Sequence, residues 1–334
     1  MVALAALWGA SYMFISIAID DGVPAPVIVW VRIVLGALAL SLMARGALAR
    51  LGGNWRPVIL IGLVQVAGPF LLITFGQRWI PSSLAAILVA SAPIFVTLLA
   101  PFIDRADALG PWGVVGIVTG ILGVGLLFGV DLSGEGTLAL GGAMVLLASV
   151  GYAFGAIWVR RDLAGVPAVA VAAGTMIVAS ALTFVPALVS VATEGAGDVQ
   201  LGTAAALLVL GVGGTGIAFY MFYALIADVG ASRASVVAYL APGFAVTYGA
   251  LFLDESITAT TIAGLVLILA GCWIAAEGRA PWSRLTRSPA LEPVATPEPA
   301  GSMVAAVVPE PCGEDLLSRS GPSRSIAPSP ARGR

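Results

Sequence analysis

The residues that could recognise a solute are few, and they lie inside long apolar stretches of the sequence. They are phenols and one amide: Tyr12, Gln65, Tyr152, Tyr220, Tyr223 and Tyr239. Tyrosine combines an apolar ring with a polar tip, and an amide in an apolar setting needs a partner. We therefore predict that these side chains line a cavity for an organic solute. Gln65 could instead bond a neighbouring helix.

Arg32 and two prolines are the other unusual residues within these stretches. Arg32 lies about five residues inside its stretch, where it either serves a solute or extends back to the surface of a membrane. Pro93 and Pro242 lie near the middle of theirs. Each should free the carbonyl four residues earlier, either as a packing kink or as a hinge that gates a cavity.

Groups for catalysis, metal binding or proton relay are missing. The chain has no histidine, and it shows no nucleophile–base pair or phosphate loop. Cys272 and Cys312 are too far apart in sequence to indicate a metal site. No acid lies in the middle of a stretch, so coupling to protons would use a peripheral acid such as Asp228 or Glu255, or the solute itself. We expect no enzyme activity, cofactor or bound metal.

Composition determines which elements position these residues. The chain is 59% hydrophobic and 10% charged, with a mean hydropathy of +1.03, so a lipid bilayer must cover it. Apolar stretches of roughly 17–25 residues match the length of a membrane-spanning helix. The fold class is therefore an all-α polytopic membrane protein with ten transmembrane helices. They are predicted at 2–19, 27–48, 57–77, 82–103, 111–130, 138–159, 167–190, 201–227, 231–252 and 259–277.

Arginines mark one side of the membrane. The even-numbered breaks between spans hold most of them, whereas the odd-numbered breaks hold acids and a single basic residue, Arg78. By the positive-inside rule, the even breaks and both termini lie in the cytoplasm of a cell whose inner or plasma membrane holds the protein. In the eighth span, Gly213, Gly216, Tyr220 and Tyr223 share a helical face. Tyr223 could alternatively belong to the aromatic belt at the cytoplasmic surface.

The two halves of the chain are related. Ser83, Pro93 and Phe95 match Ser232, Pro242 and Phe244 at a shift of 149 residues, and other short matches occur at shifts of 143 to 148. We predict two repeats of five helices, at 1–130 and 131–278. Because five is odd, the second repeat enters the membrane from the opposite side, as in many secondary transporters. Glycines at 113, 116, 120 and 123 should let helices pack closely, within the bundle or in a homodimer.

The repeats resemble the EamA-type repeats of the drug/metabolite transporter superfamily. The residues that carry this resemblance are the opening Trp8-Gly9-Ala10-Ser11, Arg32, the runs into Pro93 and Pro242, and Leu253-Asp254-Glu255 before Gly264 and Gly271. It implies ten spans, both ends in the cytoplasm, and a central cavity for small metabolites. The first half departs from the family where Asp104-Arg105-Ala106-Asp107 replaces an expected glutamate. If that acid has a gating role, the two gates are not equivalent.

The predicted function is alternating-access transport of small organic metabolites such as amino acids or drugs. Export is favoured over import. A sugar-nucleotide or lipid-linked carrier is an alternative, although no cluster of basic residues inside the spans would hold phosphates. The alternative outside transport is a non-transporting membrane scaffold or sensor. The expected partners are the solute and the lipid bilayer, with no nucleic acid. Residues 279–334 are rich in proline, serine and arginine and are predicted to form a disordered cytoplasmic tail.

Overall fold

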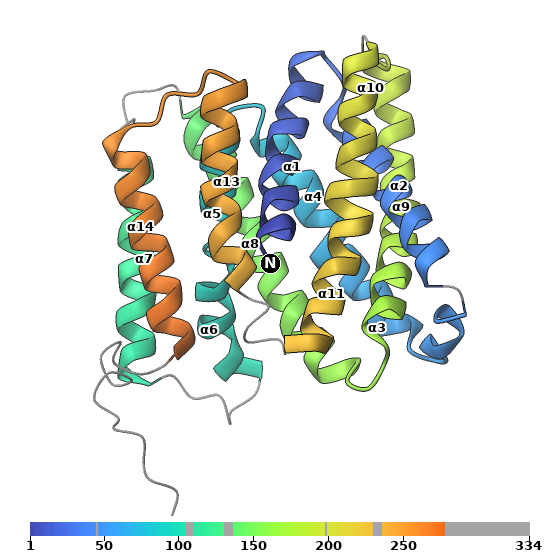
Figure 1. Cartoon of the computed structure of the whole chain (residues 1–334), viewed down its shortest axis with the longest axis horizontal. Coiled ribbons are helices and arrows are strands. Elements are labelled where there is room, and N and C mark those ends of the chain that lie inside the picture. The colour runs from blue at the N-terminus through green and yellow to red at the C-terminus, as the bar shows by residue number, and fades with distance from the viewer. Residues whose placement is uncertain (45, 104–109, 130–135, 198, 230–235, 278–334) are drawn as a thin grey trace, which may run out of the picture. The chain divides into compact units, whose positions relative to one another are not determined.

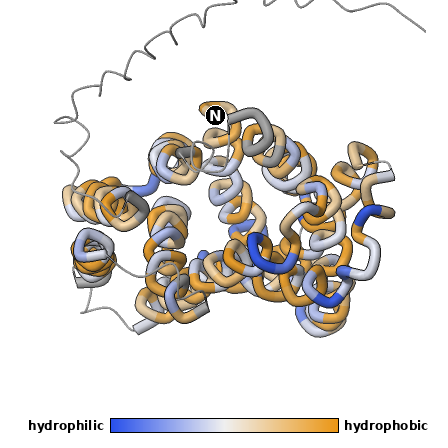
Figure 2. The backbone as a smooth tube through the Cα atoms, turned by 90° about the horizontal axis from the view of Figure 1, so that it is seen from below, coloured by the Kyte–Doolittle hydropathy of each residue, from blue (hydrophilic) through white to orange (hydrophobic). Residues whose placement is uncertain are grey.

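A computed structural model describes residues 1–44, 46–103, 110–129, 136–197, 199–229 and 236–277. These residues form helices joined by short loops and include no strand, which confirms the all-α class. The predicted tail at 279–334 lies outside the described residues. Seen from one end in Figure 2, the helices are mostly hydrophobic along their length.

The first five spans are built from continuous and interrupted helices. The first and second are α1 (Val2–Asp20) and α2 (Ala25–Met43), followed by a short 3-10 turn, η1 (Leu48–Leu51). The third is a chain of α3 (Trp55–Ile61), η2 (Gly62–Ala67) and α4 (Gly68–Gly76). The fourth consists of α5 (Ser82–Val89) and α6 (Ala92–Ile103), and the fifth is α7 (Pro111–Gly129).

The second five spans follow the same order. They begin with α8 (Thr137–Asp162) and α9 (Ala168–Glu194). The eighth span joins α10 (Leu201–Leu208), η3 (Val209–Ile217) and α11 (Ala218–Val229), and the last two are α13 (Val236–Phe252) and α14 (Ala259–Glu277). Seven of the ten are long and apolar enough to cross a bilayer, and the other three are shorter apolar helices. The ten predicted spans are confirmed.

One predicted boundary is wrong. The second span was expected to continue to residue 48, but α2 ends at Met43. Gly46 adopts a φ of +78°, a backbone conformation that glycine reaches without steric cost and that a right-handed helix cannot contain. The chain therefore turns at Gly46 and forms η1 as a separate element.

The helix contacts repeat across the two halves, as inverted repeats require (Figure 1). The second span packs on η3 of the eighth, and the seventh packs in the same way on η2 of the third. The first span packs on the ninth, and the sixth on the fourth. Three further pairs join equivalent spans: α2 with α9, α5 with α13, and α7 with α14. Each repeat is therefore completed by helices of the other.

The glycines of α7 are used inside the bundle. A Cβ atom on Gly116 would lie 2.6 Å from the carbonyl oxygen of Gly271 in α14, and one on Gly123 would lie 3.0 Å from that of Gly264. Side chains at these positions would force the two helices apart. Gly116 and Gly123 thus serve the α7–α14 contact, whereas a Cβ atom on Gly120 would meet the side chain of Ile94 in α6.

The third and eighth spans each contain a π-helical segment, which the sequence analysis did not predict. The segments η2 and η3 start at Gly62 and Val209, a separation of 147 residues that falls within the range relating the two halves. A π-helical turn has one more residue than an α-helical turn, so it changes which side chains share a face before and after it. Such segments are frequent at functional sites.

Charged residues separate the two ends of the bundle. The loops α1–α2, α9–α10 and α13–α14 gather at the end drawn at the top of Figure 1. We call this the acidic end, because it carries Asp20, Asp21, Glu194, Asp254 and Glu255. The opposite, arginine end carries Arg50, Arg56, Arg160 and Arg161.

Candidate functional site

Arg32 lies in the interior, where α2 crosses η3. Its side chain is only 6% exposed, and its Nε donates a hydrogen bond of 3.2 Å to the Thr215 hydroxyl. The guanidinium carbon lies 3.9 Å from the centroid of the Phe70 ring in α4, a cation–π contact. The interpretation that Arg32 extends to the membrane surface is therefore wrong for this structure, because the side chain is held inside by groups of both repeats.

Small residues allow this close crossing. A Cβ atom on Gly211 would lie 2.6 Å from the Cβ of Leu35, and one on Gly216 would lie 2.6 Å from the Cβ of Ala39. From the other side, a Cβ on Gly36 would lie 2.6 Å from a methyl group of Thr215. The backbones of α2 and η3 can approach only because these side chains are missing. The approach brings Thr215 within reach of Arg32.

Two of the predicted tyrosines join Arg32. Tyr12 of α1 and Tyr152 of α8 lie near the guanidinium, and both are half-buried. They pack against the same apolar cluster. We refer to Arg32, Thr215, Phe70, Tyr12 and Tyr152 as the Arg32 site. It takes three residues from the first repeat and two from the second.

A row of polar groups continues from this site along α4. Phe70, Thr74 and Gln77 are spaced by four and three residues and so share one helical face. The Gln77 amide nitrogen donates to the carbonyl of Tyr12 at 2.9 Å and to the Ser16 hydroxyl at 3.2 Å. The Thr74 hydroxyl and the Gln77 amide oxygen are buried and have no hydrogen-bond partner among the described residues. Buried polar atoms without partners are uncommon, and each needs an explanation.

The remaining predicted polar residues lie elsewhere. Gln65 is half-buried in η2 and packs against Gly155 of α8, where a Cβ atom would lie 2.6 Å from its amide carbon. Tyr239 packs at the edge of the cluster that holds Tyr12 and Tyr152. Tyr220 is 40% exposed and does not join the site. The Tyr223 side chain, like that of Asp228, lies outside the described residues.

The π-helical segment explains why Tyr220 is misplaced by the sequence pattern. The prediction aligned Gly213, Gly216 and Tyr220 on one face by counting a regular α-helix. Because η3 is π-helical as far as Ile217, it has more residues per turn than an α-helix, and Tyr220 therefore points in another direction than regular spacing predicts. Gly216 faces Gly36 and Ala39 of α2, whereas Gly213 faces Leu7 of α1, and the Tyr220 side chain is exposed.

The two prolines are not equivalent in the structure, although they occupy matching positions in the two halves of the sequence. The fourth span is divided between Val89 and Ala92, just before Pro93, whereas α13 continues through Pro242. At the first break, the carbonyl of Leu88 accepts from the hydroxyls of Ser91 at 2.6 Å and Ser149 at 3.2 Å. Leu240 stands where the first repeat has Ser91, so the second repeat lacks this local donor.

Side chains of two neighbouring helices bond to the backbone at the break in the fourth span. The Cys272 thiol of α14 donates to the carbonyl of Ala90 at 3.1 Å, and Ser149 belongs to α8. Both donors come from the second repeat. The carbonyls of Leu88 and Ala90 at the break are therefore satisfied by protein groups, which is one of the conditions for irregular backbone at membrane depth.

Glu255 connects the repeats at the acidic end. Its carboxylate accepts hydrogen bonds from the backbone N–H groups of Ser82, at 2.7 Å, and Ser83, at 3.0 Å, at the start of α5. A carboxylate is favoured there because the first N–H groups of a helix lack intrahelical partners. Gly249 makes room for it, since a Cβ at that position would lie 2.5 Å from Oε2. We call this contact the Glu255 latch.

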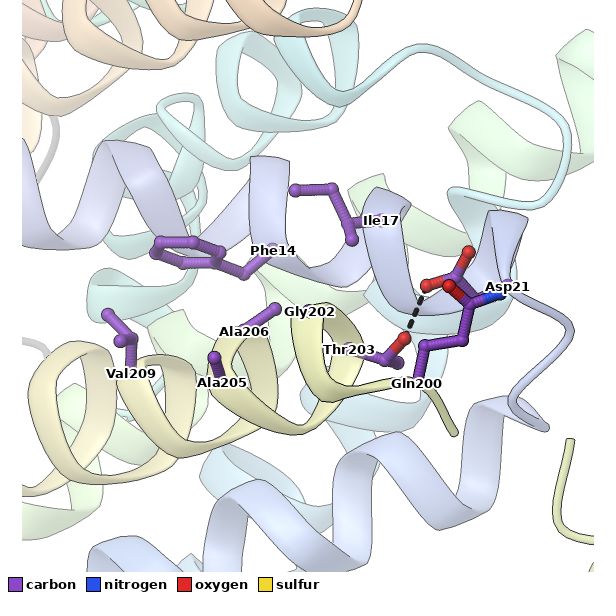
Figure 3. Close-up of a pocket in the computed structure, with 9 residues that line it drawn as sticks. All are labelled: Phe14, Ile17, Asp21, Gln200, Gly202, Thr203, Ala205, Ala206 and Val209. Atoms are coloured by element: carbon purple, nitrogen blue, oxygen red, sulfur yellow. Dashed lines mark hydrogen bonds between the residues drawn. The ribbon is translucent and has the colours of Figure 1, made fainter. Parts of the chain in front are cut away.

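A groove of about 320 Å³ lies beside a second contact between the repeats at the acidic end (Figure 3). The Thr203 hydroxyl of α10 donates to the Asp21 carboxylate, which follows α1. Phe14 and Ile17 of α1 face α10 across the groove, and the other lining residues are Gln200, Gly202, Ala205, Ala206 and Val209. The walls are mostly apolar and carry no group of the Arg32 site.

Several residues of the site escaped the sequence analysis. Gln77 was placed at the end of a span, yet its side chain is only 6% exposed. Thr215 is fully buried, and the only hint was a threonine surrounded by glycines at 211, 213, 214 and 216. Thr74 and Phe70 carry no signal in sequence that distinguishes them from other residues of an apolar helix.

Comparison with known proteins agrees with this architecture. The model of the EamA-like transporter family matches residues 1–129 and 139–276. The uncharacterized transporter YoaV of Bacillus subtilis is 23% identical, over 82% of this chain and 94% of its own length. A probable amino-acid metabolite efflux pump of Salmonella typhimurium is 27% identical, over 80% of this chain and 90% of its own length. A solved crystal structure with 22% sequence identity covers 86% of this chain and 98% of its own, with a TM-score of 0.59, and shows the same fold.

Proposed function

Because the chain belongs to the EamA-like transporter family and has its two matched repeats, we propose that it moves small organic metabolites by alternating access between them. The observation that carries this proposal is the Arg32 site, which forms only where groups of both repeats meet. In transporters built from inverted repeats, the solute site lies at this interface. Motion of one repeat against the other would open the site to alternate sides.

The contacts between the repeats support a defined starting state. In the described part of the chain, the side-chain hydrogen bonds between repeats lie at two levels. At the acidic end they are the Glu255 latch and the Asp21–Thr203 pair, and the others are buried inside. The alternate state requires the acidic-end bonds to break. We assign this structure to a state closed at the acidic end.

We place the acidic end outside the cell, with export as the direction and the cytoplasmic membrane as the location. The arginine bias supports this orientation through the positive-inside rule. The similarity to the Salmonella protein supports efflux and amino-acid metabolites as the solute class. The protein is then a carrier rather than an enzyme.

The orientation has a direct test in cells. In a variant with Cys272 and Cys312 replaced by serine, an impermeant thiol reagent added outside spheroplasts should label Ala196→Cys in the exposed α9–α10 loop. It should not label Gly53→Cys between η1 and α3, where the backbone has open space around it. Labelling of Gly53→Cys alone would reverse the orientation.

Transport is tested by counterflow in proteoliposomes that contain the purified chain. Vesicles are loaded with an unlabelled amino acid, nucleoside or drug, and uptake of the same labelled solute is followed. We expect transient accumulation of at least one solute, at least several-fold above vesicles without protein. A panel in which no solute accumulates would contradict the proposed function.

A further inference from the structure

The guanidinium of Arg32 has fewer partners than a buried cation needs. An arginine carries five N–H donors, and in the described residues only its Nε–H is bonded, to Thr215. No described carboxylate lies within salt-bridge distance of it, and the described salt bridge of the chain is at the surface, between Arg161 and Asp162. A buried charge is costly unless it is paired.

The groups around Arg32 do not replace an anion. The Phe70 ring attracts the guanidinium through its face, and the phenols of Tyr12 and Tyr152 are uncharged polar groups. Thr215 already uses its hydroxyl hydrogen for the carbonyl of Leu210, at 3.0 Å. The terminal nitrogens of the guanidinium fork are left for a partner that the described residues do not supply.

The second repeat limits how much negative charge the site can hold. The helices α2 and α9 start 143 residues apart, so Thr175 occupies the position equivalent to Arg32. Its hydroxyl bonds to its own helix, at the carbonyls of Val171 and Ala172. One guanidinium suits a single carboxylate, held by two parallel N–H···O bonds, better than a diphosphate.

We infer that Arg32 anchors the carboxylate of the transported solute, so that the substrate class is small monocarboxylates, amino acids included. This inference rests on the proposed function and assigns the chemistry of the same site. The orphan Thr74 hydroxyl and Gln77 amide oxygen lie one and two turns beyond Phe70 on the same face of α4. They are suitable acceptors for an ammonium or hydroxyl group of the same solute. They therefore extend the site toward the acidic end.

Thermal unfolding of the purified full chain with matched probes tests the anchor. The probes are L-leucine and L-phenylalanine, their deaminated acids 4-methylpentanoate and 3-phenylpropanoate, and the primary amides of both amino acids. We expect at least one carboxylate to raise the Tm while the corresponding amide, at the same concentration and ionic strength, does not. Because each amide lacks only the carboxylate of the amino acid, this comparison separates binding through Arg32 from general apolar binding.

Variants locate the effect. Arg32→Gln should weaken binding of the active carboxylate at least tenfold, and Arg32→Lys should weaken it less because the charge is kept without the planar fork. Arg56→Gln, an exposed arginine at the arginine end, is the control and should bind as the wild type does. Equal stabilisation by acid and amide overturns the inference. Unchanged binding by Arg32→Gln also overturns it. So does the lack of any effect of the carboxylates on the Tm of the wild type, a result that does not depend on whether a variant folds.

The outcomes distinguish this inference from the proposed function. If neutral solutes show counterflow while no carboxylate binds, the protein is a transporter and the anchor is wrong. If a carboxylate binds through Arg32 but no solute shows counterflow, the site is correct and transport is contradicted.

Discussion

Replacing Glu255 by alanine is expected to remove most counterflow, with a loss of about tenfold or more. The carboxylate accepts two hydrogen bonds from the start of α5, at 2.7 and 3.0 Å, and these join the loop after α13 to the other repeat. Hydrogen bonds to a charged group contribute about 1.5–3 kcal/mol each. Since about 1.4 kcal/mol changes an equilibrium tenfold, losing the latch would depopulate the state closed at the acidic end.

Two further variants show whether the carboxylate itself matters. Glu255→Gln keeps the size but replaces one acceptor oxygen with a donor that opposes a backbone N–H, so it should lose nearly as much activity as alanine. Glu194→Gln is the matched control. It is an exposed acid at the same end, whose described hydrogen bond, of 3.4 Å, is within its own helix. Equal activity of Glu255→Ala and Glu194→Gln would show that the latch has no role in transport.

The spans could be predicted from sequence because a bilayer imposes simple requirements. A run of about 20 apolar residues is needed to cross it, and polar breaks must lie outside. These requirements set all ten spans, and the odd number per half set the inversion. The end of α2 was missed because Gly46 turns the chain within residues of helical composition.

The site was harder to predict because its residues are brought together by helix crossings. Arg32 and Thr215 are 183 residues apart, and their contact depends on glycines at 36, 211 and 216. The π-helical segment η3 changed the face of Tyr220, and Ser91 made the break at Pro93 unlike the helix at Pro242. The residue spacing of a regular α-helix predicts neither of these two effects. Tyr12, Tyr152 and Arg32 were singled out from the sequence as unusual residues, but their proximity was not predicted.

The central claim is that the repeats move against each other around the Arg32 site, and distances between pairs of spin labels measure this motion. Labels at positions 20 and 200 report the acidic end, and labels at 53 and 164 report the arginine end. In each pair the two exposed positions belong to different repeats. Cys272 and Cys312 are replaced by serine in each of the doubly labelled variants. The expected change is reciprocal, because one rocking motion opens one end as it closes the other.

Glu255→Ala provides the perturbation without knowledge of the solute. Relative to the protein with Glu255 intact, the 20–200 pair should gain a population at longer distance, and the 53–164 pair should gain a matching population at shorter distance. Even one of the two hydrogen bonds of the latch, at about 1.5–3 kcal/mol, is enough to change the ratio of the two states about tenfold. Distances that stay the same at both ends, or that lengthen together, would contradict alternating access between the repeats.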